Sequence, residues 1–195
     1  MTQLRILGMT LVFVVLCAAI GMGETKVTLT ISGPGAVNDT TIKAGEPVSV
    51  DIYWENGDDD RRGFTTGFKI TSETIKNITH VADSGNGIND FGDVKAHNGW
   101  EGFSAWDFTG IRAVLVDWDG QLPDLVGFGG LRVKNVYDAH DNKKVLSWTI
   151  IVPETGMISI DSSFYKPGGI WAIVGPDGIE IKPVWGGPYT FRVVE

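Results

Sequence analysis

Val48-Ser49-Val50-Asp51-Ile52-Tyr53-Trp54 carries the clearest structural signal in this chain. Apolar and polar residues alternate along it, and successive side chains of a β-strand point to opposite faces of a sheet. The pattern therefore predicts a strand with one buried face. Residues 27–31, 64–70 and 146–152 alternate in the same way. Shorter candidate strands are 75–82, 100–106, 111–118, 131–136, 157–161, 170–174, 178–182 and 189–194.

Turn residues separate these candidate strands. Gly-Pro-Gly at 33–35, Asn56-Gly57 and Gly-Gly-Pro at 186–188 are examples. No stretch of a dozen residues keeps a helical apolar stripe free of Gly or Pro, and residues 83–99 and 121–130 are expected to be loops with at most one helical turn. Ten or so short strands cannot bury their faces as one open sheet. We therefore predict an all-β fold, a two-layer antiparallel β-sandwich.

The first 23 residues have a different composition from the rest. Arg5 and the amino terminus supply positive charge, residues 7–16 are almost wholly apolar, and small residues follow from Cys17. This order is typical of a secretory signal peptide, with cleavage expected between Ala19 and Glu24. The predicted organisation is a signal peptide at 1–23 and a single β-sandwich domain at 24–195.

Two alternatives for this segment are an uncleaved membrane anchor and a lipoprotein attached through Cys17. The apolar run is shorter than the roughly 20 residues that span a bilayer. Leu16 is larger than the residue that normally precedes a lipidated cysteine. Both observations favour the cleaved signal peptide and a secreted, extracellular or cell-surface protein, with the periplasm as an alternative location.

Composition narrows the class of protein further. Cys17 is the only cysteine, so the exported chain forms no internal disulfide. Secreted eukaryotic domains of this size usually contain disulfides, which favours a bacterial protein. The exported part has 15 basic and 24 acidic residues, a net charge of −9, and such a surface repels nucleic acid and anionic membranes.

The opening of the exported chain shows a resemblance to a known family. Residues 27–31, 42–52 and 63–70 form the order strand, Gly-Glu turn, strand, loop and a Gly-x-x-x-x-Phe strand. This order resembles the opening of cohesin-like and related immunoglobulin-like modules of bacterial exported proteins. The resemblance implies an immunoglobulin-like or cohesin-like sandwich, although a jelly roll stays open, and it places no partner-binding face. Residues 185–191, with residues 158–164 upstream, are similar to segments of secreted proteins of environmental bacteria.

Acidic, Gly-rich loops are the candidate metal site. Calcium takes about six to eight oxygen ligands from carboxylates, amides and carbonyls on flexible loops. No segment fits the twelve-residue calcium loop, and turn chemistry is the alternative, because Asp and Asn are frequent in turns. The candidate calcium ligands are Asp83, Asn86, Asn89, Asp90 and Asp93.

Aromatic residues are the candidate ligand site. Sugar-binding modules stack pyranose rings on exposed Trp and Tyr, and an aromatic patch with polar neighbours is the general form of a small-ligand site. The alternative is that these large side chains fill the sandwich interior. Trp185, in a Gly-Gly-Pro turn, is the Trp expected to be exposed. The candidate sugar-binding residues are Trp100, Trp106, Trp118 and Trp185.

Signals for catalysis are weaker. Ser104 lacks the final Gly of a nucleophile elbow. His80, His97 and His140 have no metal-binding spacing, and each is most simply a solvated loop residue. We predict an exported, non-catalytic module for adhesion or protein assembly, whose partner is a protein or a polysaccharide at the cell surface. A carbohydrate-binding module is the first alternative, and a small polysaccharide hydrolase with paired carboxylates is the second.

Overall fold

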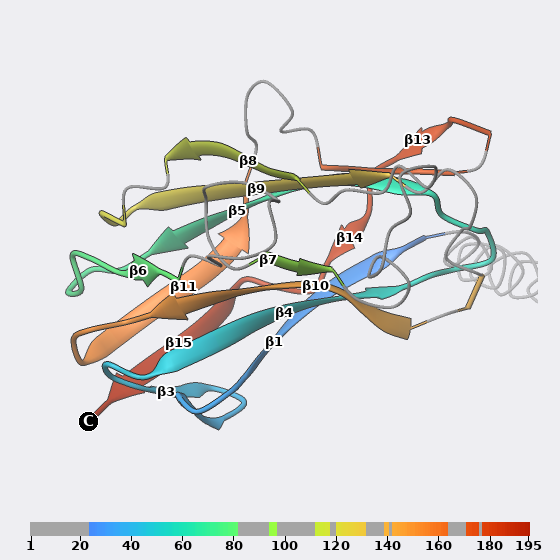
Figure 1. Ribbon diagram of the computed structural model, residues 1–195. Coiled ribbons are helices and arrows are strands. Elements are labelled where there is room, and N and C mark those ends of the chain that lie inside the picture. The colour runs from blue at the N-terminus through green and yellow to red at the C-terminus, as the bar shows by residue number, and fades with distance from the viewer. Residues whose placement is uncertain are drawn as a thin grey trace, which may run out of the picture.

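The computed structural model describes residues 24–81, 94–96, 112–117, 120–131, 139–140, 142–163, 171–175 and 177–195. Within these ranges the protein is all-β, and its fifteen strands form two sheets that pack face to face (Figure 1). This confirms the predicted two-layer sandwich. In the same ranges no helix has the length and hydropathy needed to cross a bilayer. The proposed signal peptide lies outside the described residues.

The smaller sheet has six strands built around β4. β1 and β10 pair with β4 on its two sides, both antiparallel, and β14 runs parallel to β1. The order is β14 (Val184–Trp185), β1 (Lys26–Ser32), β4 (Pro47–Glu55), β10 (Asn142–Ile151) and β6 (Thr79–His80), with β7 (Val94–Ala96) also paired with β10.

The larger sheet has nine strands built around β5 (Gly63–Thr71). β9 pairs with one edge of β5, while β11 and β12 share its other edge. β15 and β3 form a parallel pair, so two parallel pairs interrupt the antiparallel pattern that we expected. The remaining strands are β8 (Arg112–Asp117), β9 (Asp124–Leu131), β11 (Gly156–Ser162), β12 (Ala172–Val174), β13 (Glu180–Ile181), β15 (Tyr189–Val194), β3 (Thr41–Lys43) and β2 (Ala36–Asn38).

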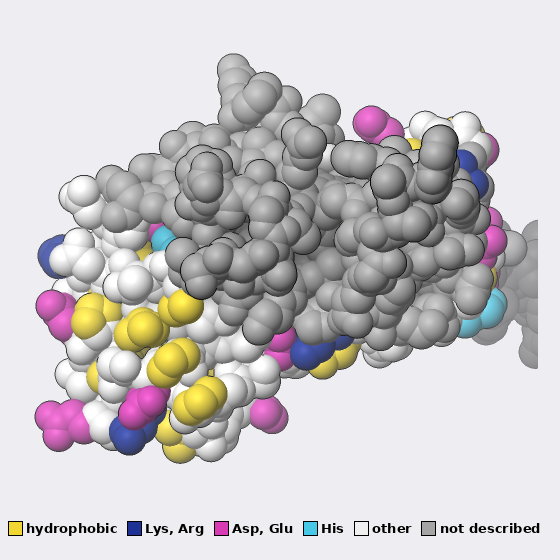
Figure 2. All heavy atoms as spheres, in the orientation of Figure 1, with side chains coloured by type: hydrophobic (Ala, Val, Ile, Leu, Met, Phe, Trp, Pro, Cys, Tyr) yellow, Lys and Arg dark blue, Asp and Glu magenta, His cyan; other side chains and the backbone are white. Residues whose placement is uncertain are grey.

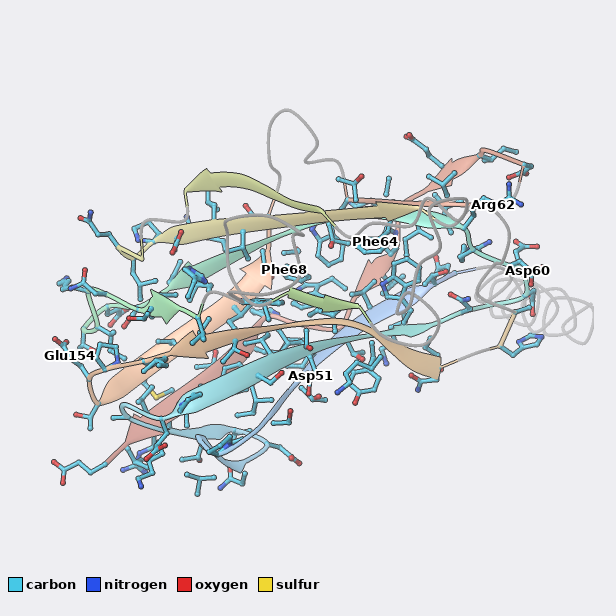
Figure 3. The ribbon with its side chains drawn as sticks, viewed as in Figure 1. Asp51, Asp60, Arg62, Phe64, Phe68 and Glu154 are labelled. Atoms are coloured by element: carbon cyan, nitrogen blue, oxygen red, sulfur yellow. The ribbon has the colours of Figure 1, made fainter. Side chains whose placement is uncertain are left out.

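The core forms between the sheets from the alternating residues. Val48, Val50, Ile52 and Trp54 of β4 are at most 1% exposed, as their alternation predicts. Trp54 meets Phe64 of β5 edge-on, with 4.8 Å between ring centroids. Figure 3 shows Phe64 and Phe68 between the two layers and Asp51 on the other side of β4. Two of the seven tryptophans, Trp54 and Trp148, lie in this core.

The structure corrects the predicted loop at 121–130, because Asp124–Leu131 is strand β9. Glycines at 127, 129 and 130 lower the strand propensity of this segment and hide its alternation. Pairing with β5 on one side and β8 on the other still holds it as a strand. The loop predicted at 83–99 likewise contains strand β7.

Other predicted boundaries change at the short elements. Candidate strand 75–82 reduces to β6 at Thr79–His80, because Ile75 and Ile78 enter the core from a connecting segment. β2, β3 and β14 were not predicted, since strands of two or three residues have too few positions to show a period. Candidate strand 100–106 and residues 132–136 lie outside the described residues.

Candidate functional site

Most of the sequence-predicted site residues lie outside the described residues. Within the described ranges, no three His, Cys, Asp or Glu side chains come together as a metal site. Calcium binding by the 83–93 loop stays a prediction. The predicted site residues that lie outside the described part of the chain are Asp83, Asn86, Asn89, Asp90, Asp93, Trp100, Trp106 and Trp118.

Trp185 is placed, and it is half-buried at the margin of the core. Its ring centroid lies 5.3 Å from that of Trp171, 5.1 Å from Tyr189 and 5.6 Å from Phe68. A Cβ on Gly187 would come within 2.6 Å of the ring, so the turn backbone also lies against it. These contacts account for Trp185 as a packing residue, and sugar binding by its ring stays a prediction.

Asp161 of β11 is the hydrogen-bond acceptor for the indole N–H of Trp185. Trp185 Nε1 donates a hydrogen bond of 2.8 Å to Asp161 Oδ1. The backbone N–H of Ser162 donates to the same oxygen at 2.8 Å. Asp161 Oδ1 therefore accepts one donor from β14 and one from its own strand, and Asp161 is an exposed residue.

Two buried carboxylates elsewhere have structural partners. Asp51 of β4 is 2% exposed, accepts hydrogen bonds from Ser32 Oγ at 2.7 Å and Ser49 Oγ at 2.9 Å, and lies 3.6 Å from Lys144 Nζ. Asp124 is 0% exposed and its Oδ2 lies 2.7 Å from His80 Nε2. The expectation of a solvated loop residue is wrong for His80, whose side chain is 3% exposed.

The outer side of the larger sheet presents a described surface that we name the β11 face. It consists of the outward residues of three adjacent strands. On β11 they alternate with Ile158 and Ile160, which are fully buried. The β11 face comprises Met157, Ser159 and Asp161 of β11, Lys69 and Thr71 of β5, and Thr190 and Arg192 of β15.

The strand register fixes which of these residues are neighbours. Met157 pairs with Arg192, and Asp161 pairs with Lys69. Ser159 lies between Thr71 and Thr190. Paired residues on one face of adjacent strands have Cβ atoms about 5 Å apart, so this is one continuous surface.

The β11 face combines an apolar side chain with hydroxyls and charges. Met157 is 49% exposed, and Lys69, Asp161, Thr190 and Arg192 are also exposed. Asp161 is the one acid among the seven residues, whereas glycoside hydrolysis usually needs a carboxylate pair. Exposed Met and Arg beside hydrogen-bonding groups are features of protein interfaces.

Figure 2 shows the charge distribution on one side of the molecule. On the side in view in Figure 2, acidic and basic side chains lie scattered among neutral and hydrophobic ones over the described atoms. Nucleic-acid binding uses Lys and Arg gathered on one face or stripe. The described atoms on this side show no such stripe.

The fold is that of cohesin modules. The chain is similar to a type II cohesin domain from the cellulosome of Acetivibrio cellulolyticus, with a TM-score of 0.60, 15% identity, and 87% of this chain and 95% of that chain covered. It is similar to the structure of a type II cohesin–X-dockerin complex from the same organism, with a TM-score of 0.61, 9% identity, and 88% and 100% covered. The chain is also similar to a cohesin module of a Clostridium perfringens family 33 glycoside hydrolase. The TM-score is 0.58, the sequence identity is 9%, and the match covers 88% of this chain and 98% of that chain.

These matches define the class of fold and not a closer relationship. No family model matches the chain, and no curated protein matches it. The chain has a cohesin-like β-sandwich fold, which confirms the resemblance seen in its opening strands. At these identities the likeness is one of fold alone.

Proposed function

We propose that this protein is a non-catalytic assembly module that binds a partner protein through the β11 face. The observation that carries the proposal is the cohesin-like fold, matched over most of this chain and nearly the whole of the cohesin modules. Two of the similar structures are cohesin–dockerin complexes, from Acetivibrio cellulolyticus and Clostridium thermocellum. Their use of the fold for protein contact supports the same use here.

The chemistry of the β11 face supports protein contact. Interfaces combine apolar anchors, among which Met and Arg are enriched, with hydrogen-bonding groups around them. Met157 and Arg192 are cross-strand neighbours on this face. The hydroxyls of Ser159, Thr71 and Thr190 form a row beside them. Such a row can exchange hydrogen bonds with a partner without burying further charge.

The proposal includes the place of action. Residues 1–23 direct export, and residues 24–195 act outside the cytoplasm or at the cell surface. The order of charge, apolar run and small residues supports export. The partner is then another exported or surface protein.

The test compares two Thr→Trp variants. The purified protein is immobilised, exposed to the secreted proteins of the source organism, and any captured protein is identified, purified and titrated by calorimetry. Thr190 and Thr30 are both exposed strand residues, one on the β11 face and one on β1 of the other sheet. We expect Thr190→Trp to weaken binding at least tenfold and Thr30→Trp to leave the Kd within about twofold.

Three outcomes would count against the proposal. Binding lost with Thr30→Trp but kept with Thr190→Trp would place the interface on the other sheet. Failure to capture any protein would oppose the assembly role. Thermal stabilisation by a soluble polysaccharide, with no protein captured, would favour the carbohydrate-binding alternative.

A further inference from the structure

We infer that the partner presents acidic side chains to the β11 face, opposite Lys69 and Arg192. This inference rests on the proposed function and specifies the chemistry of the partner. Neither Lys69 nor Arg192 has an ion pair or a side-chain hydrogen bond within the described part of the chain. Both side chains are exposed.

Lys69 lacks an ion pair even though an acid lies directly across from it. Asp161 is its cross-strand neighbour. Its Oδ1 accepts the Trp185 Nε1–H and the Ser162 N–H, both at 2.8 Å. The Trp185 hydrogen bond draws Oδ1 toward β14, and because both donors use this oxygen, it has less to offer to Lys69. The positive charge of Lys69 is thus left for a group outside the molecule.

Arg192 has uncharged cross-strand neighbours. Met157 of β11 lies on one side of it and Thr41 of β3 on the other. A guanidinium is planar and binds a carboxylate with two parallel hydrogen bonds, so an acidic side chain is the partner group that it recognises best. Met157 beside it supplies an apolar contact next to that ion pair.

Lys69 and Arg192 form a positively charged area on a chain that is acidic as a whole. The formal net charge is −8, yet the β11 face holds two cations and one acid that is already engaged. Complementary charge across an interface speeds association and selects the partner. An anionic polysaccharide would carry charge along its whole length and be repelled by the acidic remainder of the surface. A protein can place acids only where the two cations lie.

The sheet geometry sets the spacing of those acids. Lys69 and Arg192 lie two strands apart, which is about 10 Å at the usual inter-strand distance. Their positions along β11 differ by the four residues from 157 to 161, or about 13 Å. The two Cα atoms are therefore about 16 Å apart, a distance that one small interface spans.

Poly-L-glutamate is a probe for this chemistry that does not depend on identifying the partner. It is titrated into the ¹⁵N-labelled protein at low salt, and backbone amide shifts are followed by NMR. We expect the largest shifts on β5, β11 and β15, and their loss in added salt. Lys69→Glu/Arg192→Glu should weaken binding at least tenfold, whereas Lys26→Glu/Lys182→Glu, an equal charge change at exposed lysines, should not.

Several results would overturn the inference. Shifts centred elsewhere, no shifts, equal loss in both double variants, or tighter binding of heparin than of poly-L-glutamate would each do so. The result is separable from that of the proposed function. If Thr190→Trp abolishes binding of a captured partner while Lys69→Glu/Arg192→Glu leaves its Kd unchanged, the β11 face is the interface and the partner is not acidic.

Discussion

At the scale of single residues, one carboxylate joins the two sheets. Asp124, at the start of β9, lies 2.7 Å from His80 Nε2 of β6, and it also accepts the N–H groups of Gly120 and Leu125. Because Asp124 is fully buried, these contacts replace the hydrogen bonds that its oxygens would make to water. Sequence reasoning could not find this pair, since its members are 44 positions apart and neither lies in a motif.

Removing this carboxylate should destabilise the protein strongly. We expect Asp124→Ala to lower the free energy of unfolding by about 3–5 kcal/mol, because His80 and the Gly120 N–H both lose their contact with this carboxylate at a buried site. Urea unfolding measures the change. Asp39→Ala, at an exposed position, is the control and should alter stability by less than about 0.5 kcal/mol. Equal effects of the two substitutions would show that the buried pair contributes nothing.

At the scale of strands, the alternation of apolar and polar residues predicted the strands that have one buried face and one more exposed face. β4, β5 and β15 lie where their period of two placed them, because one face of each enters the core. β9 was missed because its strand character comes from its neighbours. The β11 face is similar: residues 157–161 were recognised as a strand, but only the register brings Lys69 and Arg192 beside it.

Gly120 shows how a turn positions the strand that follows. Its φ is +78°, its N–H donates to Asp124, and its carbonyl accepts the Ile78 N–H at 2.8 Å. A Cβ here would clash with the Ile78 carbonyl oxygen, whereas Gly45, with φ +76°, has nothing within 4 Å of that position. We expect Gly45→Ala to cost about 1–2 kcal/mol for its left-handed backbone, and Gly120→Ala to cost at least about 1 kcal/mol more.

Chemical denaturation measures the free energy of unfolding of the two variants. Because Gly120 and Gly45 have nearly the same φ, the difference between the two losses reports the steric clash at residue 120. If Gly120→Ala and Gly45→Ala lose the same stability, the close approach of residue 120 to Ile78 has no energetic consequence.

At the scale of the whole molecule, composition and turn spacing predicted the architecture, and the comparisons agree with it. Composition and turn spacing did not determine the function, because a β-sandwich can bind many kinds of partner and the fold alone does not identify one. Sequence reasoning selected loops and tryptophans as sites, since those stand out in a linear pattern. A flat sheet surface has no such signal, because its members come from strands far apart in the chain.

Calcium binding is testable on the intact molecule. If residues 83–93 hold calcium, a chelator lowers the melting temperature, because a ligand that binds only the folded state stabilises it by mass action. Scanning calorimetry with calcium and with EDTA makes the comparison. Superimposable curves would remove calcium from the account of this loop.

Export is also testable on the whole protein. The form recovered outside the cytoplasm should lack the first 19–23 residues, since the small residues before Glu24 fit a signal peptidase site. Intact-mass spectrometry of that form gives the answer directly. A mass that includes Met1 would contradict the assignment.

The two parallel strand pairs should make the resistance of the molecule to mechanical unfolding depend on the direction of pulling. β14 runs parallel to β1, and β15 runs parallel to β3. Tension between the N-terminal side of β1 and the C-terminal side of β15 slides these strands lengthwise, so their hydrogen bonds must break together. Tension between Glu154 and the same C-terminal side peels β11 from β15, where Gly156 pairs with Val193, and the bonds break one after another. Single-molecule pulling should therefore record a higher rupture force in the first geometry, and equal forces would mean that strand direction does not set the resistance to load.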